Sequence, residues 1–343
     1  MKKLLHTLFV TSEDAYLSLD GENVVVLRDS EKLLRLPLHN LEGIITFGYT
    51  GASPALMGAC AERKIALSFF TQSGRFLADV SGIEQGNVVL RRTQYRAADD
   101  LSKSVAISKN ILIAKLHNSR WVLERALRDH SMQIDAERVK AAALGIAESV
   151  GSLRNADTLE SLRGIEGEAA TRYFSVFDEL ILQSKEDFFF RTRNRRPPTD
   201  NINALLSFAY TLLANDIAAA IRGVGLDPFV GFHHRDRPGR RSFALDLTEE
   251  LRAVFTDRFV LSLINKRQVV SSGFHTQENG AVRLTGDARK TFLNAWQTRK
   301  QEEIRHPFLG EKVEWGLVPH VQALLMARFL RGDLDEYPPF LWK

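Results

Sequence analysis

The stretch GFHHRDRPGRRSFALDLTEELRAVFTDRFVLSLIN, residues 231–265, joins a charged loop to a helical pattern. The first part holds His233 and His234 among arginines and contains a Pro-Gly turn signal, so we expect a loop there. From Asp246 onward the apolar residues recur at helical spacing, and we place the acids in the first turn, where the helix dipole favours them. The stretch therefore predicts a helical fold in this half of the chain, entered through a loop rich in His and Arg.

The beginning of the chain has a different periodicity. Up to about residue 82, short segments rich in β-branched or aromatic residues alternate with turn signals, which is typical of strands. One helix interrupts them, with Ser53 as N-cap and Pro54 at the first helical position. From about residue 88 the apolar spacing is mostly helical. Strands are expected at residues 6–10, 15–19, 23–27, 33–38, 43–47, 66–70 and 75–80.

These patterns predict an α+β protein with two domains. A small N-terminal β-sandwich-like domain covers residues 1–85, and a larger all-α domain covers residues 86–343, with the joint near residues 82–90. Within the larger domain, Asp157 is a plausible N-cap with Glu160 at capping-box spacing. Two mid-helix glycines follow at a cost of about 1 kcal/mol each, which suggests a close backbone approach. The two glycines are Gly164 and Gly167. Further helices are expected at residues 199–223, 246–266, 287–303 and 315–333.

Composition narrows the class of protein. The 343 residues suffice for one large or two ordinary domains, and no apolar run approaches the roughly 20 residues of a membrane-spanning helix. The N-terminus favours a strand over a signal peptide. The single cysteine, Cys60, excludes an internal disulfide and a Cys-based zinc site, and it fits a reducing cytoplasm. We interpret Cys60 as a small buried apolar residue.

Arginine is clustered more than the net charge of +4 suggests. Each cluster alone fits an exposed, ion-paired surface, but three clusters in turn-rich stretches favour a polyanionic partner, because the guanidinium group pairs two phosphate oxygens at once. The candidate DNA-binding residues are Arg91, Arg92, Arg96, Arg191, Arg193, Arg195, Arg196, Arg235, Arg237, Arg240 and Arg241.

The carboxylates after the arginine loop suggest a metal site. Asp246, Glu249 and Glu250 share one turn of the expected helix. Carboxylates with one imidazole suit Mg²⁺ or Mn²⁺, and neighbouring arginines would hold phosphate. A ligand from another element is still needed, and Glu166, which stands among small residues, is the candidate. The alternatives are a solvated helix start for the acid trio and an exposed helix position for Glu166.

Several stretches together resemble the CRISPR-associated integrase/endonuclease (Cas1) family. They are GIEGEAATRYF, RPPTDNINALLSFAYTLL, the opening stretch above and the ending ARFLRGDLDEYPPFLW. The resemblance covers nearly the whole chain, including the order of β domain and helical domain. Together with LRRTQYR, it resembles a member from a type I system, and we expect subtype I-C.

The resemblance implies specific ligands. Glu166, His234 and Glu249 match the family's catalytic metal ligands, with Glu249 where many relatives have Asp, and His233 has no assigned role. Asp246 matches a neighbouring acid that serves as a second acid or supports the site. Glu250 has no implied role, and we expect it at the surface. Other family-like positions are Tyr173, Asn203, Ser207 and Tyr210.

The resemblance also implies an activity. Such proteins insert the 3′-OH ends of a short DNA duplex, the prespacer, into the CRISPR repeat by transesterification with Mg²⁺ or Mn²⁺. They form homodimers through the β domain and assemble with the small protein Cas2, and we expect this chain to bind double-stranded DNA in the cytoplasm and not a membrane. Two alternatives stay open: a non-catalytic DNA-binding scaffold of the same fold, and a metallohydrolase for small phosphorylated molecules.

Overall fold

The computed structural model describes residues 6–12, 14–29, 31–72, 74–80 and 88–342. The chain divides into two compact units. The β unit comprises Met1–Gln85 with Leu284–Glu302, and the helical unit comprises Gly86–Arg283 with Glu303–Lys343. Residues 81–87, which include most of the joint expected at residues 82–90, lie outside the described residues.

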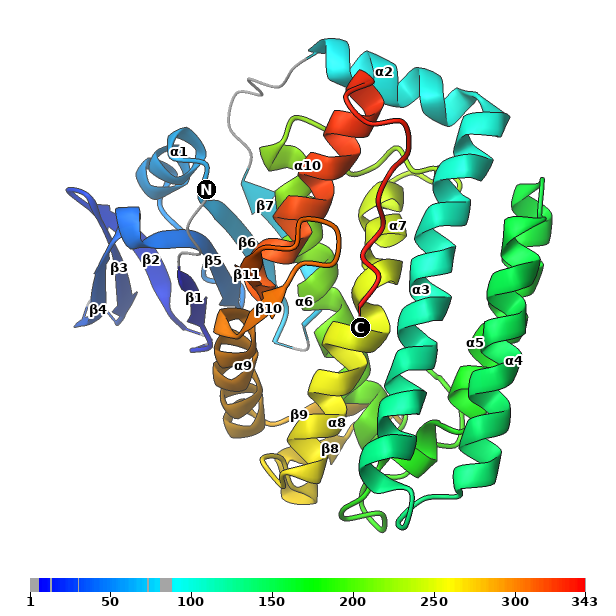
Figure 1. The fold of residues 1–343 in the computed structure, drawn as a ribbon. Coiled ribbons are helices and arrows are strands. Elements are labelled where there is room, and N and C mark those ends of the chain that lie inside the picture. The colour runs from blue at the N-terminus through cyan, green and yellow to red at the C-terminus, as the bar shows by residue number, and fades with distance from the viewer. Residues whose placement is uncertain (1–5, 13, 30, 73, 81–87, 343) are drawn as a thin grey trace. The chain divides into compact units, whose positions relative to one another are not determined.

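The β unit contains two sheets (Figure 1). In the four-stranded sheet the order is β1-β5-β6-β7; β5 pairs in parallel with β1 and β6, whereas β6 and β7 are antiparallel. The three-stranded sheet β2-β3-β4 is antiparallel. All seven expected strands are present: β1 His6–Val10, β2 Tyr16–Asp20, β3 Asn23–Arg28, β4 Glu31–Pro37, β5 Leu41–Phe47, β6 Ala66–Phe70 and β7 Phe76–Val80.

One helix, α1 (Pro54–Glu62), shares a core with both sheets. It begins as expected, because the Ser53 hydroxyl accepts a hydrogen bond from the Leu56 amide at 3.2 Å and proline stands in the first turn. Cys60 is fully buried in this core as a free thiol, and burial raises its pKa to about 11. The β-rich N-terminal region is thus confirmed, while the sandwich arrangement stays a prediction.

The helix α9 (Gly286–Gln301) belongs to the β unit, although we expected it in the helical domain. The Gln297 side chain donates to the Thr7 carbonyl of β1 at 2.9 Å, and Lys300 pairs with Glu42 of β5 at 3.3 Å. A contiguous boundary at residue 86 is therefore wrong for this segment. Periodicity shows that a segment is helical, but it does not show which core the apolar face covers.

The helical unit is organised around the long helix α3. In Figure 1, α4 and α5 lie on one side of α3 and α7 on the other. The predicted helical character of this region is confirmed. Its main elements are α2 Val88–Asp99, α3 Leu101–His130, α4 Ala136–Arg154, α5 Leu159–Ser175, η2 Phe177–Leu180, α6 Asn201–Gly223, α7 Ser242–Leu251, η3 Arg252–Asp257, α8 Arg258–Asn265, η5 Trp315–Leu317 and α10 Val318–Arg331, with short strands β8 Phe274–Thr276, β9 Val282–Leu284, β10 Glu303–Arg305 and β11 Lys312–Glu314.

The helix α6 is long and apolar enough to cross a membrane, by length and composition alone. We had excluded a membrane-spanning helix from the sequence and did not anticipate this. Its buried residues surround the helix, and it packs against α7, α8 and α10. A helix that is apolar on all sides and covered by neighbours is a core helix of the helical unit.

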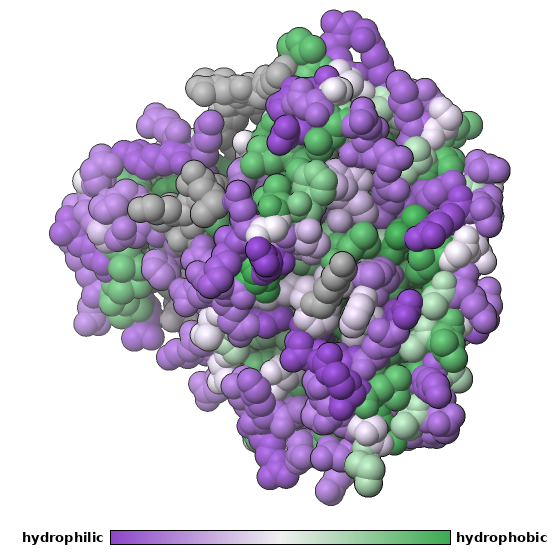
Figure 2. Space-filling view, viewed as in Figure 1, coloured by the Kyte–Doolittle hydropathy of each residue, from purple (hydrophilic) through white to green (hydrophobic). Residues whose placement is uncertain are grey.

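On the face in view, apolar residues form separate patches among polar ones (Figure 2).

Two local expectations for the site helices are wrong. The N-cap of α5 is Thr158, whose hydroxyl accepts from the Ser161 amide at 3.1 Å, rather than Asp157. A Cβ added at Gly164 or Gly167 would meet no heavy atom within 4 Å, so these glycines mark no close backbone approach. The small residues of α5 leave open space beside Glu166 instead.

The helix α7 begins at Ser242, before the acids that we had placed in its first turn. Asp246, Glu249 and Glu250 therefore lie in later turns, where the N-terminal dipole does not account for them. After Leu251 the helix continues through the π-helical segment η3 into α8. A single π turn shifts the register of side chains on a helix, and it does so here directly after the candidate ligand.

Candidate metal centre

Glu166 of α5 and Glu249 of α7 meet at a lysine of α3. The Lys115 ammonium lies 2.7 Å from Glu249 Oε2 and also pairs with Glu166 Oε1. Arg252, at the start of η3, donates to Glu249 Oε1 at 2.6 Å. These four side chains, which we call the charge quartet, alternate in sign from Glu166 through Lys115 and Glu249 to Arg252.

Glu249 and Lys115 of the quartet keep their charges despite burial. Burial alone would raise the pKa of Glu249, but Arg252 and Lys115 more than offset this effect and hold the pKa at about 2. Burial would lower the pKa of Lys115, yet Glu249 and Glu166 outweigh it and raise that pKa. Glu249 and Lys115 are therefore ionised across the physiological pH range.

His234 is held by Asp246, which is fully buried. Asp246 Oδ1 accepts from the His234 ring nitrogen Nδ1 at 2.7 Å and from its backbone amide at 2.9 Å. Asp246 Oδ2 accepts from the amides of Phe232 (2.7 Å) and His233 (3.1 Å). A carboxylate that fixes Nδ1 leaves Nε2 as the ligating atom, the arrangement typical of metal-bound histidines. Asp246 thus orients the His234 imidazole. Both carboxylate oxygens of Asp246 already accept hydrogen bonds from the loop.

The loop before the histidines needs a glycine at residue 231, which we had not singled out from the sequence. A Cβ added at Gly231 would lie 2.8 Å from Asp246 Oδ2 and 2.9 Å from Ser242. Any larger residue would push the loop away from the carboxylate that anchors His234. The spacing of Gly231 to the histidines was visible in the sequence, but the approach of α7 to it was not.

The two neighbouring histidines differ in their surroundings. His233 is buried, its carbonyl accepts from Arg163 at 2.9 Å, and burial lowers its pKa. Its Nδ1 has no hydrogen-bond partner among the described residues. Because His234 is the one with an anchoring carboxylate, the geometry supports our choice of His234 as the ligand.

A second buried cluster adjoins the quartet. The Tyr173 hydroxyl donates to Asp257 Oδ2 at 3.1 Å, and the Tyr210 hydroxyl donates to Asp257 Oδ1. Burial raises the pKa of Asp257 to about 6. The Arg252 guanidinium stacks 4.4 Å from the centre of the Tyr210 ring and so links this cluster to Glu249. Tyr173 and Tyr210 therefore bind Asp257, and their role at the candidate site stays a prediction.

Asn203 and Ser207 hold the loop that precedes α6. Asn203 Oδ1 accepts from Arg193 at 2.6 Å and from the Asn194 amide at 3.2 Å, and Arg193 also donates to Ser207 at 3.0 Å. The Arg193 guanidinium stacks 5.3 Å from the centre of the Tyr210 ring. Arg193, which we proposed for DNA, is thus committed to internal contacts.

The other candidate arginines fall into two groups. Arg91, Arg92 and Arg96 lie on α2, not in a turn-rich stretch as we had assumed. In the 235–241 loop, Arg240 donates to the Arg235 carbonyl and Arg241 to Asn215 at 3.3 Å, so part of this cluster closes the loop. The exposed members are Arg92, Arg96, Arg191, Arg195, Arg196, Arg235 and Arg237, and the partly buried ones are Arg91, Arg193, Arg240 and Arg241.

Three residues of this arrangement escaped the sequence analysis: Lys115, Arg252 and Asp257. A single lysine in a helical pattern carries no signal of its own. Arg252, three residues after Glu249, was detectable from helical spacing. Glu250, expected at the surface, is fully buried. No pattern in the sequence signalled this burial, because the partners of Glu250 come from distant residues of the C-terminal segment.

The donors fit a hard divalent cation. Two carboxylates and one imidazole suit Mg²⁺ or Mn²⁺, and Glu249 Oε2 is buried with no hydrogen bond among the described residues besides its ion pair with Lys115. Within the described part of the chain, however, no group of three such residues is already drawn together around one point. Glu166 and Glu249 instead both contact the Lys115 ammonium.

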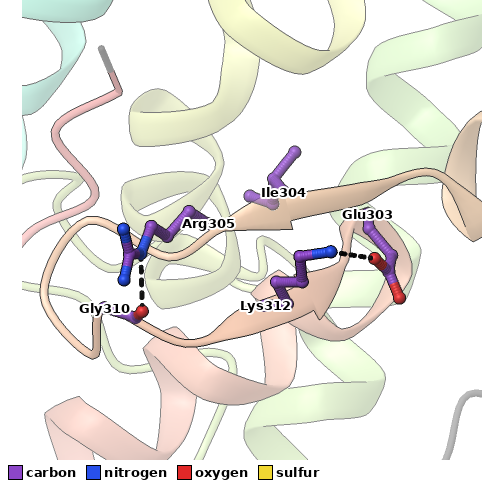
Figure 3. Close-up of a pocket in the computed structure, with 5 residues that line it drawn as sticks. All are labelled: Glu303, Ile304, Arg305, Gly310 and Lys312. Atoms are coloured by element: carbon purple, nitrogen blue, oxygen red, sulfur yellow. Dashed lines mark hydrogen bonds and ion pairs between the residues drawn. The ribbon is translucent and has the colours of Figure 1, made fainter.

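A hollow elsewhere in the helical unit has no part in this site. It lies on the β10–β11 hairpin and is lined by Glu303, Ile304, Arg305, Gly310 and Lys312 (Figure 3). An exposed ion pair joins Lys312 to Glu303 at 3.3 Å, and Arg305 donates to the Gly310 carbonyl. None of the candidate ligands contributes to this hollow.

Fold and site together define an α+β protein with a β-rich N-terminal unit and an acidic–histidine cluster in a helical unit. Residues 8–298 match the family model described as CRISPR associated protein Cas1. The chain therefore belongs to the Cas1 family, as its sequence had suggested.

Curated relatives agree over the full length. The chain is 50% identical over 343 residues to a CRISPR-associated endonuclease Cas1 of Chlorobaculum tepidum, and 51% identical over 347 residues to one of Rhodospirillum rubrum, with both chains fully covered in each case. Solved structures share the fold. A casposase bound to integration product has a TM-score of 0.84 at 23% identity, covering 99% of this chain and 95% of that one. A Cas1 protein from Thermotoga maritima has a TM-score of 0.82 at 22% identity, covering 95% and 97%.

Proposed function

We propose that this protein is a metal-dependent DNA integrase and endonuclease of CRISPR adaptation. One observation carries the proposal: Glu166 and Glu249, from two helices, converge on the buried ammonium of Lys115. The third proposed ligand, His234, is held by the Asp246 carboxylate. Relatives about 50% identical over the whole chain are named endonucleases, which supports the same chemistry here.

The proposed reaction is a transesterification that conserves the number of phosphodiester bonds. The 3′-oxygen of the prespacer loses its proton and attacks a phosphorus of the repeat. A new P–O bond forms, the bond to the repeat's own 3′-oxygen breaks, and that oxygen takes up a proton. No covalent enzyme intermediate and no redox partner are needed.

Glu166, His234 and Glu249 would hold Mg²⁺ or Mn²⁺ in this reaction. The bound ion would stabilise negative charge on the attacking oxygen and around the phosphorus. Asp246 keeps His234 in the tautomer with a proton on Nδ1, so that Nε2 offers a lone pair. Arg252 holds Glu249 in place, and Arg252 in turn stacks on the Tyr210 ring, whose hydroxyl is bonded to Asp257.

DNA would be the partner of the exposed arginines. Their contacts with the backbone would make binding salt-sensitive and largely independent of sequence, while the repeat is read partly by shape. We further propose a homodimer formed through the β domain, assembly with Cas2, a cytoplasmic location and membership of a type I system of subtype I-C. The Cas2 proposal is supported by a solved Cas6-RT-Cas1–Cas2 complex with a TM-score of 0.83. The match spans all of this chain and 36% of the chain in that complex.

The test removes one ligand. Glu166→Ala should abolish integration of a labelled prespacer into a repeat-bearing plasmid and leave DNA binding nearly intact. Glu168→Ala is the matched control, because Glu168 lies two residues away on α5 and pairs only at the surface with Arg172 at 2.6 Å. Full integration by Glu166→Ala would disprove the site assignment.

One observation favours the alternative of a non-catalytic DNA-binding scaffold. Lys115 stands between two of the ligands, and such an ion pair can be purely structural. A scaffold would act equally with and without divalent metal, so the Glu166→Ala assay should be repeated with a chelator. A metallohydrolase for small phosphorylated molecules would show no salt-dependent DNA affinity, which a binding assay at two ionic strengths detects.

A further inference from the structure

The Lys115 ammonium stands where the two carboxylate ligands converge. It is 2.7 Å from Glu249 Oε2 and pairs with Glu166 Oε1, and these are oxygens that a shared divalent ion would use. The Lys115 side chain is only 14% exposed, so water screens its ion pairs with the two carboxylates only weakly. A lysine in this setting has one evident electrostatic task, which is to neutralise two acids that would otherwise repel each other.

The charges of the quartet sum to zero. Glu166 and Glu249 contribute two negative charges, and Lys115 and Arg252 contribute two positive ones. Because Arg252 already occupies Glu249 Oε1, the oxygen Oε2 is the one left for another cation, and Lys115 takes it. A metal ion and this ammonium cannot share the same oxygens, since two cations at such short range repel strongly.

We propose that Lys115 is a resident counter-ion that occupies the divalent-cation position in the metal-free protein and leaves it when metal binds. This inference rests on the proposed metal site. Lys115 is then a positioning residue: it holds the carboxylates of Glu166 and Glu249 close together until the metal arrives. It also weakens metal binding, because the incoming ion must displace an ion pair that is already satisfied.

This arrangement couples metal to DNA. A divalent ion added to a neutral quartet leaves an excess of two positive charges, which an anionic phosphodiester offsets. The displaced ammonium is free to pair with the phosphate rather than return. Metal should therefore bind more tightly in the presence of DNA than in its absence.

The experiment measures Mn²⁺ binding calorimetrically to the full chain without DNA. Lys115→Met should bind Mn²⁺ about tenfold more tightly than the unsubstituted protein or better, since no ammonium has to leave. Its melting temperature in EDTA should fall, because the carboxylates repel, and saturating Mn²⁺ should restore it. Lys109→Met is the control on the same helix: Lys109 donates to the Arg154 carbonyl at the surface, and its loss should change neither value.

The outcomes separate this inference from the proposed function. If the unsubstituted protein binds Mn²⁺ and Glu166→Ala does not, equal or weaker binding by Lys115→Met overturns the counter-ion role and leaves the metal site standing. If no protein binds Mn²⁺ saturably, both fail. Should Lys115→Met not fold in EDTA, Lys115→Gln replaces it. Failure of both variants to fold even in saturating Mn²⁺ would show that metal cannot replace the ammonium and would overturn the proposal.

Discussion

Glu249 and Glu250 are consecutive residues of α7, both buried, and they occupy opposite electrostatic environments. Glu249 faces Lys115 and Arg252, which hold its pKa at about 2. Glu250 faces the C-terminal segment, where burial raises its pKa to about 7. It accepts hydrogen bonds from the Tyr337 hydroxyl (2.7 Å), the Gln322 amide (2.8 Å) and the Phe340 backbone (2.9 Å).

The difference teaches that the environment, not the residue type, assigns the role. Consecutive side chains point about 100° apart around a helix, so one faces the charged site and the other faces neutral donors. Glu249 has cations to stabilise its charge and is suited to hold a metal. Glu250 has none, and it instead fastens the end of the chain, with Asn118 bonding both the Glu250 and the Phe340 carbonyls.

The largest effect should separate the two glutamates in activity. Glu249→Gln should lower integration about 100-fold or more, because a neutral amide is a poor ligand, removes the ion pair of Arg252 and leaves Lys115 with Glu166 alone. Glu250→Gln should keep integration within a few-fold of the unsubstituted rate. Equal losses in the plasmid integration assay, with both proteins folded by circular dichroism, would break the comparison.

A smaller effect concerns pH and stability. Glu250 keeps its proton up to about pH 7 when folded but releases it near pH 4.5 when unfolded, so the unfolded state binds fewer protons between these values. The free energy of unfolding should therefore fall as pH rises through this window, by on the order of 3 kcal/mol from this group. In Glu250→Gln this contribution should be absent, which urea denaturation at pH 5 and pH 8 would detect. An unchanged pH dependence would contradict the assigned environment.

The smallest effect tests the clamp alone. Tyr337→Phe removes one hydroxyl donor to Glu250 and should lower the free energy of unfolding by about 1 kcal/mol. Integration should be unchanged, because Tyr337 contacts no residue of the charge quartet among its described partners. A loss of integration comparable to that of Glu249→Gln would show that the clamp and the site act as one unit.

The sequence predicted elements better than their termini and partners. The strands and several helices, such as α5 and α6, were visible because alternation and helical spacing are local properties, whereas α2, α3 and α4 were expected only as a generally helical region. The start of α7 was missed, since Ser242–Leu245 become helical through packing and not through a capping signal. Glu166, His234 and Glu249 came from the family resemblance, which spacing alone did not single out. Lys115 was missed because its role exists only where α3, α5 and α7 meet.

By itself, the sequence determined the periodicity of each segment, the family and the types of donor atom near the site. The tertiary structure alone decided that α9 joins the β unit, that Glu249 is charged while Glu250 favours its proton, and that a lysine stands between the proposed ligands. Local patterns depend on neighbours within a few residues of the chain. Burial and Coulomb interactions depend on distances in space, which only the folded chain sets.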